Sequence, residues 1–169
     1  SDTTDEQDDM DLYGINANYA LNKDTTLEAY WFERRRAGEG TSHDYANKSD
    51  RVDVLGARVA TILPYDLKYQ LEGAIQLGRY IAYAYTANRR AFAFQTSLAK
   101  DLAMKYSPSI MAKYSYFSGA KGNEHKRTRA WDPMFENQTQ GHIWNLLFDQ
   151  TNAHIAGIAG TVKPLEDIT

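Results

Sequence analysis

Cysteine is absent from the 169 residues, so the chain forms no disulfide bond and offers no cysteine ligand for zinc. Long apolar runs are absent as well. Nowhere do about 18 apolar residues follow one another, which excludes a membrane-spanning helix. The opening SDTTDEQDDMD has neither the basic start nor the apolar stretch of a signal peptide, so we expect a mature or shortened chain. The compartment stays open at this point.

Catalytic and metal-binding motifs are also missing. The histidines His43, His125, His142 and His154 show no HExxH spacing, and the sequence has no GxSxG elbow to support a serine nucleophile. The glycines are spread singly, so they form no phosphate-binding loop. We therefore expect no enzyme activity, no cofactor and no metal site, and we interpret the histidines as isolated surface residues.

Acidic residues are concentrated at the start of the chain. Six of the 22 Asp and Glu residues fall within the first 11 positions, which leaves 16 acids and 19 bases in the rest. Nothing in this head has the spacing of a calcium loop, so we expect residues 1–10 to form an acidic, solvated loop or tail. The body of the protein is mildly basic.

What the sequence does contain is alternation. The stretch YQLEGAIQLG, Tyr69 to Gly78, places apolar residues at every second position, which is typical of a half-buried strand. In a soluble sandwich the apolar face would point to the core, whereas in a membrane barrel it would point to lipid. The two arrangements imply different functions.

Seven segments show this period of two, and each is about 10 to 13 residues long, the length that a tilted strand needs to cross a bilayer. The predicted strands are Leu12 to Leu21, Thr26 to Arg35, Val52 to Leu63, Leu67 to Gly78, Arg90 to Lys100, Pro108 to Ser118 and Asn152 to Lys163. Charged residues inside the strands keep to one face, and aromatic residues gather near the strand ends of the other, as in the girdles of membrane barrels.

The connections between these segments alternate between short and long. NKDT, PYD and DLAMKYS are short, whereas RAGEGTSHDYANKSD, RYIAYAYTANR and residues 119–151 are long. Transmembrane barrels combine short periplasmic turns with long extracellular loops. The first, third, fifth and seventh strands are therefore predicted to run toward the periplasm.

The longest connection contains a basic cluster and an apolar stretch. His125 to Ala130, HKRTRA, lacks the interleaved aromatic residues of a nucleic-acid groove, so we expect a loop that attracts anions and no nucleic-acid partner. Ile143, Leu146 and Leu147 have the spacing of a short helix. The segment is expected to fold over or into a barrel mouth, or to pack on neighbouring loops without gating.

The order of DLYGINANYALNKDTTLEAYWFERRR, YDLKYQLEGAIQLGRY, FSGAKG, WDPMFENQT and TNAHIAGIAGTVKP resembles the bacterial outer-membrane alginate-export (AlgE-like) family, from about Asp11 to Pro164. The step from FSGAKG to WDPMFE is the distinctive part. The resemblance implies a monomeric, antiparallel up-and-down transmembrane β-barrel in the bacterial outer membrane. It also implies passive export or diffusion of an anionic polysaccharide, alginate-like, or of small anions.

The resemblance further implies a lumen lined by the polar faces of the strands. The lumen residues expected on this basis are Asn16, Glu28, Arg34, Arg58, Lys68, Gln70, Glu72, Gln76 and Lys113, and the loop residues are Lys126, Arg127, Arg129, Trp131 and Asp132. Bases would attract a polyanion, while acids and amides would accept or donate hydrogen bonds to sugar hydroxyls. Alternatively, acids and bases on adjacent strands only pair with each other across the wall.

Seven strands do not close the even-numbered barrel of this class, so residues 1–169 are expected to form part of one larger barrel domain. Two other functions remain open. One is a soluble all-β domain that binds or hydrolyses a carbohydrate, and the other is a general porin without preference for a saccharide.

Overall fold

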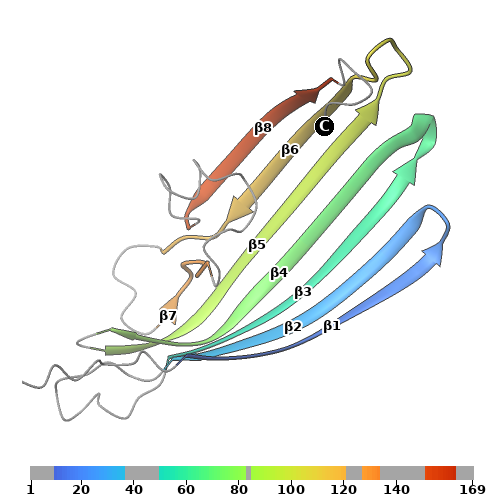
Figure 1. Ribbon diagram of the computed structural model, residues 1–169. Helices are drawn as coiled ribbons and strands as arrows, with labels where there is room; N and C mark the ends of the chain where they lie inside the picture. The colour runs from blue at the N-terminus through green and yellow to red at the C-terminus, as the bar shows by residue number, and fades with distance from the viewer. Residues whose placement is uncertain (1–9, 37–49, 83–84, 121–126, 134–150, 163–169) are drawn as a thin grey trace, which may run out of the picture.

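A single antiparallel sheet accounts for most of the chain (Figure 1). The structure is a computed structural model that describes residues 10–36, 50–82, 85–120, 127–133 and 151–162. Its strands are β1 (Met10–Asn22), β2 (Thr25–Arg36), β3 (Asp50–Leu63), β4 (Leu67–Ala82), β5 (Tyr85–Asp101), β6 (Ser109–Phe117), β7 (Arg127–Thr128) and β8 (Ala153–Thr161). A short 3-10 helix, η1 (Pro64–Asp66), joins β3 to β4. Among the described residues, no helix is long and apolar enough to cross a membrane.

The seven long strands correspond to the seven predicted segments, and the up-and-down order is confirmed. Each strand pairs antiparallel with its neighbour in the order β1-β2-β3-β4-β5-β6-β8. The sheet is therefore the wall of a β-barrel, left open here between β1 and β8 in the described part of the chain. Alternation predicted the strands well because each has one polar and one apolar face.

One predicted long connection is wrong. The segment RYIAYAYTANR, expected to be a loop after β4, continues the strands instead, and pairing extends as far as Ala82 opposite Tyr85. Tyrosine, isoleucine and threonine favour extended backbone, so this segment extends the hairpin. The other two long connections leave the sheet at the same end as this hairpin, and the short turns lie at the opposite end (Figure 1).

A short strand occurs where only a loop was expected. β7, within residues 119–151, pairs parallel to β5, with Arg127 opposite Asn88 and Thr128 opposite Arg89. It takes the edge of β5 that β6 leaves free, because β6 pairs only with Ala93 and the residues after it. The acidic head before Met10 and the helix predicted around Ile143 lie outside the described residues.

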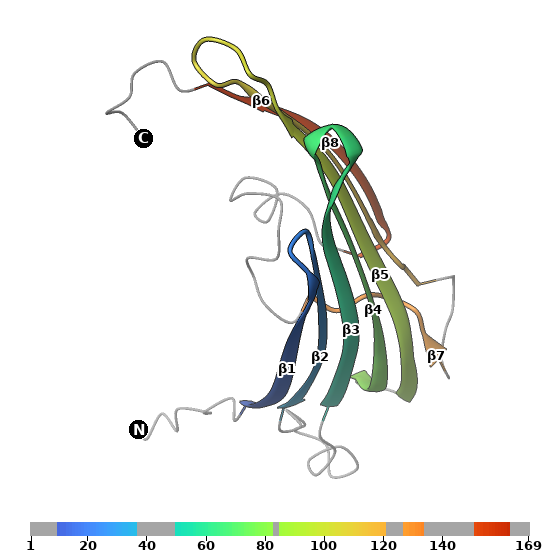
Figure 2. The same cartoon turned by 90° about the vertical axis from the view of Figure 1, so that its right-hand side faces the viewer.

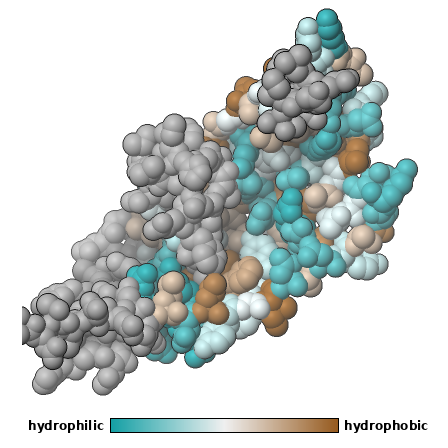
Figure 3. Space-filling view, viewed as in Figure 1, coloured by the Kyte–Doolittle hydropathy of each residue, from teal (hydrophilic) through white to brown (hydrophobic). Residues whose placement is uncertain are grey.

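The sheet is curved, which gives it a concave and a convex face (Figure 2). Even-numbered residues of β1 to β4 and odd-numbered residues of β5, β6 and β8 share the concave face, because the registers place them opposite one another. This face is turned toward the viewer in Figures 1 and 3, where hydrophilic side chains gather across its middle. Residues of the other parity form the convex face.

Large apolar side chains cover the convex face and are exposed. Leu71 is 39% exposed, Ile75 47% and Phe94 38%, and none of them contributes to a dry interior. A soluble sandwich would bury these side chains, so the exposed belt is the arrangement of a strand wall facing lipid.

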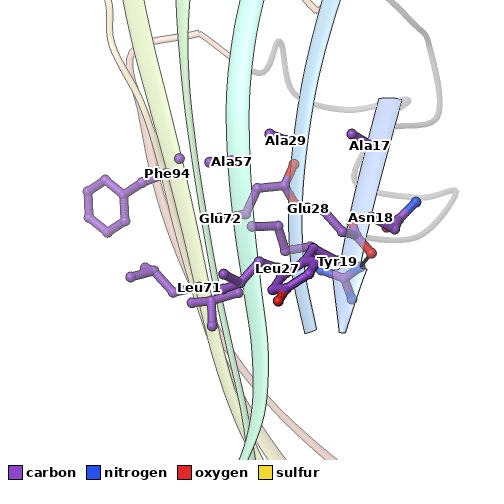
Figure 4. Close-up of a pocket in the computed structure, with 13 residues that line it drawn as sticks. Ala17, Asn18, Tyr19, Leu27, Glu28, Ala29, Ala57, Leu71, Glu72 and Phe94 are labelled. Carbon is purple, nitrogen blue, oxygen red and sulfur yellow. Dashed lines mark hydrogen bonds and ion pairs between the residues drawn. The ribbon is translucent and has the colours of Figure 1, made fainter. Parts of the chain in front are cut away.

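The convex face also holds a shallow hollow of about 730 Å³ (Figure 4). It lies where small residues cross neighbouring strands, with Ala29 opposite Ala57 and Ala57 opposite Gly73. In Figure 4 the side chains of Phe94 and Leu71 point away from Glu72, which belongs to the concave face. The apolar rim of this hollow suits hydrocarbon chains better than sugars.

Candidate functional site

The concave face collects the charged and amide side chains of the strands and is the candidate site. Among the described residues, nothing covers the part of this face nearer the short turns, whereas residues 127–133, which we call the inserted segment, lie on the part nearer the long connections. Val52, Val54, Ala91, Ala93, Phe117 and Trp131 form a dry cluster beneath and around this segment. The polar face of the wall therefore has a core of its own.

The open part carries a pair of linked polar contacts across three strands. Arg58 Nη1 donates to Glu28 Oε1 at 2.9 Å, joining β3 to β2. Tyr30 lies across Gly56 and its hydroxyl donates to Glu72 Oε1 at 2.6 Å, so one side chain spans from β2 to β4. A Cβ at Gly56 would lie 2.2 Å from the Tyr30 ring, so only glycine leaves room for this crossing.

Ser118 fixes the point where the chain leaves the sheet after β6. Its N–H donates to the Phe92 carbonyl at 3.0 Å, and its hydroxyl accepts from Phe92 N at 2.9 Å and donates to the Arg129 carbonyl at 2.7 Å. Its own carbonyl accepts from Trp131 N at 2.9 Å and Asn152 N at 3.2 Å. These hydrogen bonds connect β5, the inserted segment and the start of β8. Ser118 is only 3% exposed, so water does not compete for them.

Asp132 anchors the inserted segment to the concave face through its side chain. Arg34 of β2 donates two hydrogen bonds to the carboxylate, at 3.1 Å to Oδ1 and 2.8 Å to Oδ2. Arg89 of β5 approaches Oδ2 at 3.1 Å. The side chains of Arg34 and Arg89 are 7% and 4% exposed, so two nearly buried guanidinium groups share one carboxylate. Asp50, 3.7 Å from Arg34 Nη2, supplies a second negative charge.

The backbone of Asp132 is held as well. Gln76 Nε2 donates to the Asp132 carbonyl at 2.6 Å, and the Asp132 N–H donates to Gln76 Oε1 at 2.8 Å. The amide thus pairs with the backbone as a neighbouring strand would, and Gln76 has no exposed surface. Arg89 Nη1 adds a hydrogen bond to the Ala130 carbonyl at 3.0 Å. The segment is therefore fixed by side chains from β2, β4 and β5.

A hollow of about 400 Å³ separates the inserted segment from the open polar layer. Trp131 packs against Phe117, with ring centroids 6.2 Å apart, and borders the hollow on the side of the long connections. Its indole nitrogen is buried and has no hydrogen-bond partner among the described residues. Tyr30, Glu72 and other polar residues border the hollow on the side of the short turns. Aromatic surface beside carboxylates and amides is a combination that can contact sugars.

The predicted lumen residues all lie on the concave face, and the structure brings some of them together. Arg34 and Gln76 meet at Asp132, while Glu28, Arg58 and Glu72 lie in or beside the open polar layer. Two of the remaining predicted residues also lie beside the open polar layer: Asn16 of β1 borders the 400 Å³ hollow, and Lys113 of β6 is close enough to Glu72 to interact with its charge. Gln70 lies on β4 nearer the short turns, and Lys68 pairs with Asp101 at 2.6 Å beside those turns.

The predicted loop residues separate into two groups. Trp131 and Asp132 turn onto the concave face, whereas Arg127 and Arg129 are exposed. Lys126 lies outside the described residues. The sequence reasoning missed Arg89, because it lay in the segment interpreted as a loop. Extending the alternation of Ala91 and Ala93 backwards would have placed Arg89 on the same face.

The described residues contain no group of three His, Cys, Asp or Glu side chains able to hold a metal ion. His154, the one histidine within them, lies on the convex face, where its Nδ1 is 2.7 Å from the Tyr114 hydroxyl and its ring packs on Tyr116. It forms part of an aromatic group at the rim of the apolar belt.

A protein-family model described as "Alginate export" matches residues 1–169, the whole chain. No curated protein and no solved structure matches it. The matched region includes the strands, the Ser118 junction and the inserted segment.

Proposed function

Because the chain belongs to the alginate export family, we propose that it forms the wall of an outer-membrane channel through which an alginate-like anionic polysaccharide, or small anions, pass by passive diffusion. The family supports export of a polysaccharide across the outer membrane, and transport families of this kind perform no chemistry. In this proposal the concave face borders the passage, the convex face contacts lipid, and one monomeric barrel forms the channel.

The observation that carries the proposal is the separation of the two faces. Along β4 the convex face is apolar from Leu67 to Leu77, ten residues further on. Ten residues of strand cover about 33 Å, or about 25 Å across the membrane at a tilt near 40°, which equals the apolar band of outer-membrane barrels. The concave face over the same length carries Glu72 and Gln76.

The chemistry of the concave face suits a uronic sugar, which combines one carboxylate with several hydroxyl groups. Arg58 and Lys113 can meet the carboxylate, while Glu28, Glu72 and Gln95 offer acceptors and donors for hydroxyls. Acids and bases alternate across the wall, so the face holds a hydrated solute at many weak points and at no single tight one. Such binding favours passage over retention.

The inserted segment gives the channel a shape that a bare wall lacks. Since residues 127–133 lie against the concave face, they narrow the passage beside β2, β4 and β5. A polysaccharide would pass Trp131 at the level of the 400 Å³ hollow. This supports an extended chain as the solute, because such a chain passes a narrow level one sugar at a time.

The test is single-channel conductance of the full-length protein in planar bilayers. We expect polyuronate to block the current reversibly and a neutral glucan of equal length to block it less. Lys113→Gln should reduce the ratio of anion to cation permeability. Lys105→Gln makes the same charge change on an exposed turn and should leave the ratio unchanged. If polyuronate and the neutral glucan act alike, the protein is a general porin without preference for a saccharide.

A further inference from the structure

Arginines occupy one level of the convex face on neighbouring strands. Arg35 of β2 lies opposite Arg51 of β3, and Arg51 lies opposite Arg79 of β4. Arg79 lies opposite Asn88 of β5, and β7 places Arg127 on the other side of Asn88. Arg35, Arg51, Arg79 and Arg127 form what we call the arginine row, and all four are exposed.

This arrangement carries an electrostatic cost. Like charges directly opposite each other on a sheet destabilise it. Glu33, which is 3% exposed, contacts both Arg35 and Arg51 and relieves one end of the row. Arg79 faces Arg51 on one side and Asn88 on the other, and it forms no ion pair with any described residue. A bound anion would offset the repulsion that remains at this position.

The local backbone holds Arg79 in this place. Gly78 has a φ of +145°, and a Cβ there would lie 2.0 Å from the Arg51 carbonyl oxygen. A side chain at this position would push β4 away from β3. Glycine therefore permits the close pairing that keeps Arg79 opposite Arg51, despite the repulsion between them.

Positive charge exceeds negative charge at this end of the convex face. Arg90, opposite Leu77, adds a fifth exposed arginine beside the row. Among the described residues, the acidic side chains of the same surface are Glu33, Asp11 opposite Arg35, and Asp53, which Arg51 contacts at 2.9 Å. Five arginines against three acids leave an excess of two, and all three acids lie on β1 to β3. The excess falls on β4, β5 and β7.

The row lies just beyond the apolar belt, on the side of the long connections. Leu55 of the belt is four residues from Arg51 along β3, about 13 Å of strand. Trp31 lies opposite Leu55 and donates from Nε1 to Asp53 Oδ1 at 3.2 Å, in the direction of the row, as an indole does at a membrane interface. In a barrel with long extracellular loops, this level meets the headgroups of the outer leaflet.

We propose that the arginine row binds a phosphate-bearing lipid headgroup of the outer leaflet. Guanidinium groups bind phosphate bidentately and are weakly hydrated, which suits a site at the edge of hydrocarbon. Two phosphates on one glycolipid could bridge Arg79 to Arg51 and Arg127. The site lies on the face opposite to the passage, so it does not depend on which solute the channel carries.

The experiment uses the full-length protein in detergent and counts bound lipid by native mass spectrometry. The probes are a bisphosphorylated glycolipid (lipid A), its dephosphorylated form and inorganic phosphate. We expect the first to be retained and the double variant Arg79→Gln/Arg127→Gln to weaken its binding roughly tenfold or more. Lys100→Gln, which removes one charge from the convex face at the short-turn end, should leave binding unchanged.

Thermal unfolding supplies a second measurement that separates binding from folding. Without lipid, Arg79→Gln should unfold no earlier than the wild type, because the variant relieves the repulsion from Arg51. With the bisphosphorylated lipid, the wild type should gain more stability than the variant. Equal retention of the dephosphorylated lipid, or an equal loss in Lys100→Gln, would overturn the proposal. Displacement of the lipid by inorganic phosphate alone would assign the row to free phosphate and overturn it too.

Discussion

The ion pair between Asp132 and Arg34 should contribute more to stability than any exposed pair on the same face. Replacing Asp132 by Asn removes the charge and keeps the shape, which leaves Arg34 and Arg89 buried without their shared carboxylate. Breaking a buried pair in this way costs about 3–5 kcal/mol. Asp50 remains 3.7 Å from Arg34 and compensates in part, so we expect about 3 kcal/mol.

A double-mutant cycle isolates the contact itself. Asp132→Asn, Arg34→Gln and the double variant should give a coupling energy of about 2 kcal/mol, since close buried charge pairs couple by about 1.5 kcal/mol or more. The matched control is Lys68 and Asp101, which are 2.6 Å apart but 56% and 61% exposed. Exposed pairs couple by about 0.2–1 kcal/mol because water and salt screen them.

The assay is urea unfolding of the full-length protein in lipid vesicles, followed by tryptophan fluorescence at two salt concentrations. Added salt should reduce the coupling of Lys68 to Asp101 and leave that of Asp132 to Arg34 nearly unchanged. Equal coupling energies for the two pairs would refute the view that Asp132 holds the inserted segment by a desolvated charge.

Three further substitutions test the faces and the close approach of the strands by the same unfolding measurement. Tyr30→Phe should cost about 1.5–3 kcal/mol, because it removes a hydrogen bond to the Glu72 carboxylate; no loss would mean that the bond is not formed. Leu71→Arg should cost about 2–4 kcal/mol on the lipid side, whereas Gln70→Arg on the opposite face should cost much less; equal costs would contradict the assignment of the faces. Gly78→Ala should destabilise by more than about 1 kcal/mol, because the new Cβ meets backbone at 2.0 Å, and a neutral result would refute this steric account.

Strand positions were predictable because the side-chain period of a strand is local information. Leu71 and Glu72 alternate whatever lies further along the chain, so the sequence alone indicated both the strand and its two faces. Strand ends were less predictable. Tyr85 to Arg89 follow the same period, but tyrosine and asparagine also occur in loops, and the pairing that extends β4 and β5 depends on contacts between them.

The clamp at Asp132 could not be predicted, because its members are far apart in the sequence and come together only through the sheet register. Arg34 and Gln76 were expected on the polar face, yet nothing local indicates that Asp132, more than 50 residues from either, turns onto that face between them. Ser118 is equally ordinary in the sequence. Its importance arises from the three segments that meet there.

The inserted segment also explains why part of the polar face is dry. Alternation assigns Val52, Val54 and Ala91 to the concave face, which is otherwise polar. Trp131 covers them, so these positions form a small core that binds the segment to the wall. Beyond that core the concave face is polar again, and Glu28 and its partner Arg58 border the 400 Å³ hollow. The same alternation of side chains therefore produces two kinds of surface on the concave face. The surface is a dry cluster where the inserted segment packs on it, and it is polar where the segment does not reach.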